Sequence, residues 1–311
     1  MHAITVLGFP DYAEPSQRLG ALLGARQALV GVHRFPDGES RVTLPPALAG
    51  HLVFCRSLDR PNDKLIELLL AARTARDSGA TTLTLVAPYL CYMRQDIAFH
   101  PGEAISQRII GRMLADMFDN VITVDPHLHR IARLDDVLPA RNALALSAAP
   151  LLGDFLCEHV PGALLLGPDA ESLQWVGAIA ESHGFDFGVC IKVRSGDRDV
   201  TVELSAVDCS QRNVVLVDDM ASTGCTLAAA AAQCLARGAR SVDVLVVHGL
   251  FFGDAVDQLR QSGVGRIWST DSIPHSTSVI PLAAMLAAAV RRLDEGAMAA
   301  RPIGNAEQED R

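Results

Sequence analysis

Residues 213–227 contain the sequence feature that most constrains the fold. Residues 214–217 form an unbroken apolar run of valine and leucine, which is typical of a strand buried on both faces of a parallel sheet. Asp218 and Asp219 follow at once, then a short loop rich in Ser, Thr and Gly, and then an Ala-rich segment that predicts a helix to about Arg237. Because parallel strands need crossover connections, usually helices, this stretch predicts an α/β fold.

The loop between this strand and this helix contains Ser222, Thr223, Gly224, Cys225 and Thr226. Such a loop at a helix N-terminus aims backbone N–H groups and the helix dipole at a phosphate. The two preceding acids would repel a bare phosphate, but they suit sugar hydroxyls or a bound metal ion. The stretch therefore predicts a site for a phosphorylated sugar. The alternative is an ordinary turn whose Asp and Ser residues only cap the helix.

Composition limits the partners of the chain. Its 311 residues carry a net charge of −9, which argues against a nucleic acid or an anionic membrane as the main partner. No apolar run is long enough to span a bilayer, and the first residues lack the pattern of a signal peptide. The seven cysteines are dispersed without a CxxC pair, so we expect a cytoplasmic protein with reduced thiols.

Predicted strands and helices alternate along the whole chain in two successive blocks. This order predicts two doubly wound parallel-sheet α/β domains. We place the first domain at residues 1–146 and the second at residues 147–296, with a linker near residues 147–150. The last helix could pack back on the first domain. Residues 297–311 lack apolar periodicity, and we expect them to be disordered.

Polar loops follow several of the strands in the first block. Phe35, Asp37 and Glu39 lie in a Pro/Gly-rich turn that predicts a hairpin, and its aromatic ring could stack on a flat ligand. The alternative is a plain surface hairpin. Arg94 and Gln95 follow a predicted strand at residues 82–87 and could bind a phosphate chain or a base. An exposed loop with a salt bridge is the alternative.

The strand at residues 121–124 ends in Asp125-Pro126-His127. A carboxylate and an imidazole two residues apart at a strand end can hold a divalent metal or metal-bound phosphates. A structural histidine is the alternative. In the second block, Asp169 again lies at a strand end.

A second hairpin is predicted at residues 188–204. Lys192 and Arg194 lie two residues apart, so they project from the same face of a strand and could reach a phosphate chain. The alternative is a solvated edge strand that its charges protect from unwanted pairing.

Taken together, these motifs identify the chain as a member of the ribose-phosphate diphosphokinase family, the phosphoribosyl pyrophosphate (PRPP) synthetases. Residues 213–227 resemble the PRPP-binding motif that these enzymes share with phosphoribosyltransferases. The resemblance extends from about Arg34 to Pro274 and includes the FPDGE turn, the PYLCYMRQD loop, the DPH and GPD motifs and the TDSIP end. Residues 102–106 and the DPH phrase are similar to the archaeal-type branch. The phosphate loop STGCT and the basic pair in Lys-Val-Arg depart from the pattern of many bacterial and animal members.

The resemblance implies transfer of the diphosphoryl group of Mg·ATP to O1 of ribose 5-phosphate, giving PRPP and AMP. It implies Mg²⁺ as cofactor and a homo-oligomer with the ATP site near a subunit contact. The implied catalytic pair is Lys192 and Arg194. The implied ATP-binding residues are Phe35, Asp37, Glu39, Arg94, Gln95, Asp96 and His127. Ribose 5-phosphate would bind to Asp218, Asp219, Ser222, Thr223, Gly224, Cys225 and Thr226, and metal to Asp125, His127 and Asp169.

Two other functions fit part of the pattern. A phosphoribosyltransferase would consume PRPP, although simple members are about one domain long and lack the motifs of the first block. A non-catalytic regulatory subunit associated with PRPP synthetase is the other possibility. The presence of Lys192, Arg194 and the two adjacent acids Asp218 and Asp219 argues against that subunit.

Overall fold

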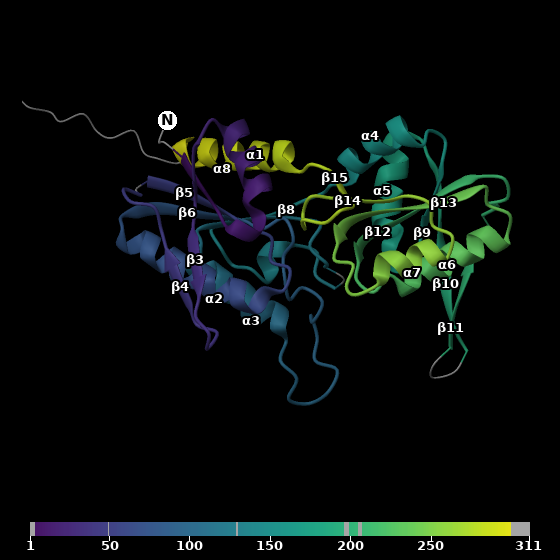
Figure 1. The fold of residues 1–311 in the computed structure, drawn as a ribbon, viewed down its shortest axis with the longest axis horizontal. Helices are drawn as coiled ribbons and strands as arrows, with labels where there is room; N and C mark the ends of the chain where they lie inside the picture. The colour runs from purple at the N-terminus through teal and green to yellow at the C-terminus, as the bar shows by residue number, and fades with distance from the viewer. Residues whose placement is uncertain (1–3, 49, 129, 196–198, 205–206, 300–311) are drawn as a thin grey trace, which may run out of the picture.

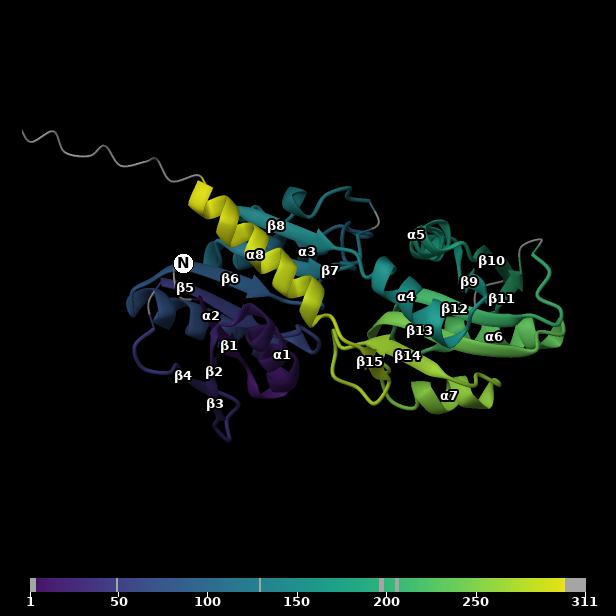
Figure 2. The same ribbon diagram turned by 90° about the horizontal axis from the view of Figure 1, so that it is seen from above.

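A computed structural model describes residues 4–48, 50–128, 130–195, 199–204 and 207–299. Side chains are described for these residues except 191–195, 199–204 and 296–299. Two sheets lie side by side, and helices cover both faces of each (Figures 1 and 2). The predicted doubly wound α/β architecture is confirmed.

The first sheet is parallel throughout its described strands. Their order is β2 (Arg26–Leu29), β1 (Ile4–Gly8), β5 (Gly50–Cys55), β6 (Ala80–Val86), β7 (Asn120–Val124) and β8 (Asn142–Leu146). Helices α2 (Pro61–Asp77) and α3 (Ser106–Met117) cover one face, and α1 (Ala13–Leu23) lies on the other beside α8 (Ala283–Ala299) (Figure 1). Helix α8 is the last helix along the chain, yet it packs against α1 and β7 of the first half.

The second sheet has the described order β11 (Asp199–Leu204), β10 (Asp186–Ser195), β9 (Leu164–Gly167), β12 (Asn213–Ala221), β13 (Ser241–Gly249), β14 (Ile267–Thr270) and β15 (Ser278–Ile280). Only the β10–β11 pairing is antiparallel among these strands. This pair is the hairpin predicted at residues 188–204.

Alternate residues of the central strands pack against opposite helical layers. Val215 and Val217 belong to a buried cluster with α4 (Ala149–His159) and α5 (Leu173–His183). Val214 and Leu216 belong to another with α6 (Cys225–Ala236) and α7 (Ala255–Gln261). All four side chains are 0% exposed, which explains why the strand is apolar without alternation.

The hairpin predicted around Phe35 is present as β3 (Gly31–Arg34) and β4 (Ser40–Thr43). It is anchored to α2 by Glu67, whose buried carboxylate accepts from Arg34 at 3.2 Å and Ser40 at 3.2 Å. In Figure 2 the hairpin lies beside the β2 edge of the first sheet and does not reach the second sheet.

The end of each sheet that carries the strand C-termini faces the other sheet. His248 near the end of β13 is hydrogen-bonded to the Val124 carbonyl at the end of β7. In the second sheet, neighbouring strands β9 and β12 connect to the rest of the sheet in opposite directions. Ligands of open α/β sheets bind at such a switch point, beyond the carboxyl ends of the strands.

Two segments differ from the sequence expectations. Helix α4 begins at Ala149 and has Pro150 in its first turn, so the second half of the expected linker, residues 149–150, is the start of a helix. Helix α8 extends to Ala299, so residues 297–299 belong to it, and the remaining tail, 300–311, lies outside the described residues. None of the described helices has the length and apolarity needed to cross a membrane.

Candidate active site

The loop after β12 is a small hollow at the start of a helix. Gly224 has φ +76° and is the N-cap of α6, which begins at Cys225. The loop and its neighbours enclose a cavity of about 140 Å³. Because the first N–H groups of a helix have no partners inside the helix, this geometry suits an anion.

Three carboxylates gather beside the loop at the switch point. Asp218 accepts a hydrogen bond from the Asp219 amide at 3.0 Å. Burial, followed by the nearby charges of Asp219 and Asp169, raises the pKa of Asp218 well above its usual range. Asp169 also caps the turn that precedes α5, since its Oδ1 accepts from the Glu171 and Ser172 amides at 3.1 and 3.3 Å. A cation or a set of donor hydroxyls would relieve this concentration of negative charge.

One contact joins the site residues of the two halves. His127 Nδ1, from the loop after β7, lies 2.5 Å from Oδ2 of Asp219, from the end of β12. The Asp219 residue is 2% exposed, so the pair is largely shielded from water. The structure thereby brings a predicted nucleotide residue and a predicted sugar residue into direct contact.

Arg94 also crosses from the first half to the second. Its Nη2 and Nε atoms lie 2.6 and 3.2 Å from the Met220 sulfur, and the residue lines the phosphate-loop cavity. Its neighbours in the predicted motif have internal partners: Gln95 Nε2 donates to the Ile97 carbonyl at 3.0 Å, and buried Asp96 is paired with Arg130 at 2.8 Å. Within this motif, Arg94 is therefore the residue that the structure brings to the loop.

Asp125, a predicted metal ligand, contacts the segment that leads into α4. Its Oδ2 accepts from the Ala148 amide at 2.8 Å, just before α4. Its backbone has φ +35°, an uncommon conformation for a non-glycine residue. Burial raises the pKa of this carboxyl to about 6. Among the described residues, no three His, Cys, Asp or Glu side chains converge as a set that could hold a metal ion.

The remaining predicted residues lie in the two hairpins. Phe35 is 39% exposed and packs edge-on against His33, while Asp37 accepts from the Glu39 amide at 3.1 Å within the turn. Lys192 and Arg194 lie on β10 opposite Val202 and Val200 of β11. Their side chains lie outside the described residues.

His248 is a site residue for which the sequence pattern predicts no role. It is 1% exposed, and its Nε2 lies 3.1 and 3.2 Å from the carbonyl oxygens of Val124 and Asp125. Burial lowers its pKa to about 4. The only sequence signal is a His-Gly pair at the end of a buried strand, and its partner is 124 positions away along the chain.

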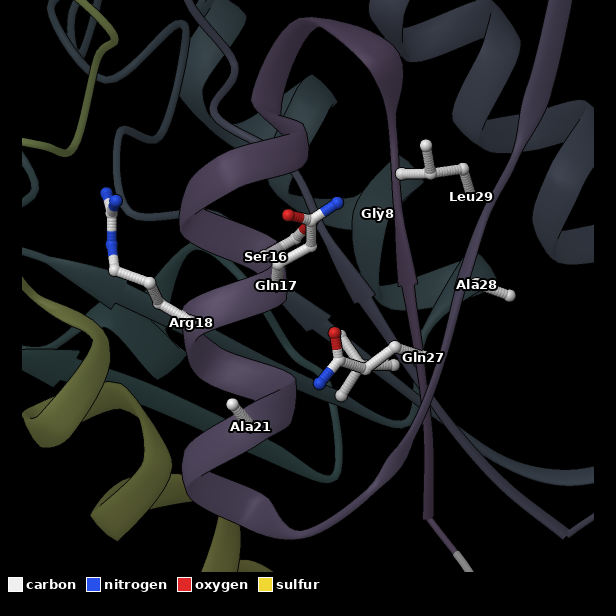
Figure 3. Close-up of a pocket in the computed structure, with 9 residues that line it drawn as sticks. Gly8, Ser16, Gln17, Arg18, Ala21, Gln27, Ala28 and Leu29 are labelled. Atoms are coloured by element: carbon white, nitrogen blue, oxygen red, sulfur yellow. The ribbon is translucent and has the colours of Figure 1, made fainter.

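A larger cavity, of about 480 Å³, lies away from these residues, between α1 and strands β1 and β2. Figure 3 shows the Gln17 amide beside Ser16 on α1, with Gln27 and Leu29 on the neighbouring strand. The head group of Arg18 points away from this group (Figure 3) and pairs with Asp271 at 2.8 Å. The cavity lacks the concentration of charge found at the switch point.

A solved structure shows the class to which this fold belongs. The phosphoribosylpyrophosphate synthetase from Mycobacterium smegmatis matches with a TM-score of 0.82 and 21% sequence identity. The match covers 94% of this chain and 99% of that one. The two-sheet α/β fold is therefore that of a phosphoribosylpyrophosphate synthetase.

Sequence relatives then show the family. Residues 7–117 match the N-terminal domain of ribose phosphate pyrophosphokinase, and residues 200–301 match the phosphoribosyl synthetase-associated domain. The ribose-phosphate pyrophosphokinase of Methanopyrus kandleri is 34% identical, with 93% of this chain and 99% of the relative covered. That of Halobacterium salinarum is 35% identical, with 88% and 95% covered. The chain belongs to the ribose-phosphate pyrophosphokinase family, and archaeal members dominate its most similar relatives.

These matches run through both halves of the chain. They support the pyrophosphokinase prediction rather than a phosphoribosyltransferase or a non-catalytic associated subunit. The predicted resemblance to the archaeal-type branch is confirmed by the same relatives.

Proposed function

We propose that the enzyme joins ATP and ribose 5-phosphate at the junction of its two sheets and transfers a diphosphoryl group between them. The first domain, residues 1–146, supplies the ATP side, and the second, residues 147–296, supplies the sugar phosphate side. The observation that carries this proposal is the 2.5 Å contact between His127 and Asp219. It joins one residue from each half of the chain, and we place the meeting point of the two substrates there.

The sugar phosphate would occupy the hollow after β12. Its 5-phosphate would accept from the N–H groups at the start of α6 and from the hydroxyls of Ser222, Thr223 and Thr226. Its ring hydroxyls would donate to Asp218 and Asp219. The raised pKa of Asp218 supports this role, because a carboxylate held in a desolvated, negative environment gains from hydrogen-bond donors.

The triphosphate would lie between the first sheet and this hollow, with Arg94 binding it. Phe35, Asp37 and Glu39 belong to a hairpin that does not reach the second sheet (Figure 2). They would therefore border an adenine bound to a neighbouring subunit rather than one bound in the same chain. This arrangement requires a homo-oligomer, and it would place the ATP site near a subunit contact.

The donor set fits Mg²⁺ that arrives with the nucleotide. Mg²⁺ commonly binds through one or two carboxylates together with substrate phosphates and water. The neighbouring carboxylates of Asp218, Asp219 and Asp169 at the switch point support that mode. His127, Asp169 and the acids Asp218 and Asp219 would hold the metal–nucleotide complex. When bound, Mg²⁺ would neutralise charge on the transferring phosphoryl oxygens.

In the reaction, O1 of ribose 5-phosphate attacks the β-phosphorus of ATP, and the bond from that phosphorus to the oxygen bridging it to the α-phosphorus breaks. AMP leaves with that oxygen, and the O1 proton is lost. The protein has to align the two substrates and stabilise negative charge that develops in the transition state. Lys192 and Arg194, which occupy alternate positions along β10, are suited to the second task because both carry positive charge.

The proposal is tested with purified protein, ATP, ribose 5-phosphate and Mg²⁺. AMP and PRPP should form in equal amounts, only when all three are present, and a chelator should abolish both. Ribose without its phosphate should be a very poor substrate. AMP formation that does not depend on ribose 5-phosphate would reject the proposal.

A further inference from the structure

The loop that carries His127 is held in an uncommon conformation by contacts from several directions. Asp125 has φ +35°. Its amide donates to the Leu146 carbonyl at 2.8 Å, and its Oδ2 accepts from the Ala148 amide at 2.8 Å. Such backbone conformations persist where surrounding contacts over-determine them, often at functional sites.

The contact to this loop from the second half comes from His248, near the end of β13. Nε2 faces the two carbonyl oxygens of Val124 and Asp125 at 3.1 and 3.2 Å. Since carbonyls only accept hydrogen bonds, Nε2 carries the proton. On the other side of the ring, Nδ1 lies 2.9 Å from Oγ of Ser272, and this contact helps to fix the orientation of the imidazole.

A third direction is provided by Tyr89, whose ring packs edge-on against the imidazole with centroids 5.0 Å apart. His248 therefore contacts the loop after β6, the loop after β7 and the segment after β14. These are three of the motifs on which the sequence prediction was based. The ring is 1% exposed, so water cannot readily replace the hydrogen bonds that it makes.

We infer that His248 is a positioning residue for the diphosphoryl transfer, which holds the loop of residues 124–127 so that His127 meets Asp219. The inference rests on the proposed function, because it assigns His248 an effect through His127 rather than through a contact with substrate. Without the Nε2 donor, two buried carbonyls at the junction lose their partner and the loop is free to relax away from its strained conformation. The phosphate loop after β12 would be unaffected by that relaxation.

The variants His248→Ala and His248→Gln test this role, since the glutamine amide restores a donor. His51 provides a matched control, because it is 6% exposed and its Nε2 is hydrogen-bonded to the Thr84 hydroxyl at 2.8 Å. It lies at the amino end of β5, whereas the site lies beyond the carboxyl ends of the strands. We expect His248→Ala to lower kcat/KM for Mg·ATP at least about tenfold more than His51→Ala does, with KM for ribose 5-phosphate changed by less than about threefold. His248→Gln should recover most of the loss. Equal losses at His248 and His51, or a glutamine variant no better than the alanine one, would overturn the inference.

A double variant shows whether the effect passes through His127. Combining His248→Ala with His127→Ala should cost little beyond His127→Ala alone, within about threefold, since the loop then has no histidine to position. Losses that multiply would mean that His248 acts by another route.

Calorimetric titration with Mg·ATP separates failure of this inference from failure of the proposed function. Wild-type protein that binds Mg·ATP but forms no AMP would reject the proposed function. Weaker binding of Mg·ATP by His248→Ala than by His51→Ala would still support the positioning role of His248. If the wild type forms AMP and PRPP while His248→Ala matches His51→Ala in both assays, only the positioning role of His248 is rejected. The variant Ser272→Ala, which removes the partner of Nδ1 but keeps the imidazole, should show a smaller loss of the same kind.

Discussion

Replacing Asp125 by asparagine should change how the stability of the protein depends on pH. The carboxyl is 9% exposed, and burial raises its pKa from 3.8 to about 6. A shift of about two units corresponds to roughly 3 kcal/mol against the charged form in the folded protein. Asparagine keeps an oxygen that can accept from the Ala148 amide, but it carries no charge.

The direction in which the free energy of unfolding changes with pH follows from proton binding to Asp125. The folded state holds the Asp125 proton more tightly than the unfolded chain does, so this group contributes full stability below about pH 4 and loses it as pH rises to about pH 6. Above that range the wild type retains a buried charge that the variant lacks. The free energy of unfolding of Asp125→Asn, relative to wild type, should therefore rise by about 2–3 kcal/mol between pH 4 and pH 7.

Urea unfolding of both proteins across this pH range, without metal or nucleotide, provides the measurement. Taking the difference between the two curves removes contributions from the other titrating groups, provided that both proteins unfold in a two-state manner. A difference that stays constant across the range would show that the Asp125 carboxylate is not desolvated and would refute this reasoning.

Three further predictions concern the sugar phosphate side. Lys192→Ala should lower kcat about a hundredfold or more with a much smaller change in KM for ribose 5-phosphate, if the lysine acts on transition-state charge; near-normal turnover would remove it from the catalytic set. Gly224→Val should abolish ribose 5-phosphate binding while calorimetry still detects ATP, because φ is +76°, a backbone conformation that valine rarely adopts; lost ATP binding with ribose 5-phosphate binding retained would reverse the two sites. Cys225 and Cys157 are the exposed cysteines of the described residues, so ribose 5-phosphate should slow alkylation of Cys225 and leave Cys157 unchanged; equal rates at Cys225 with and without the ligand would place the sugar elsewhere.

The sequence was sufficient to predict the fold class and the places where polar loops follow buried strands. The run at residues 214–217 has no alternation because both faces are covered by helices. The phosphate loop, Asp169 and the loop of His127 all lie beyond strand carboxyl ends in the structure. Strand order alone then brings such loops together, and the sequence pattern already contains that information.

Features that depend on how the two halves meet could not be predicted in this way. Pro150 suggested a linker, although proline is also favoured in the first turn of a helix, which is where it lies in α4. The carboxylate of Asp125, a predicted metal ligand, also accepts from the Ala148 amide just before that helix, and no local pattern marks this contact. The contact of His248 with Val124 joins positions in different sheets, and no local pattern marks it.

The position of a label in the product tests the central claim most directly. The claim is that an oxygen of the sugar bound in the second half attacks the β-phosphorus of ATP bound against the first, at the junction marked by His127 and Asp219. With ATP radiolabelled at the β-phosphorus, all the transferred label should appear in the diphosphate of PRPP while unlabelled AMP accumulates in equal amount. Label that remains in ADP, with a single phosphoryl group transferred to the sugar, would contradict the account.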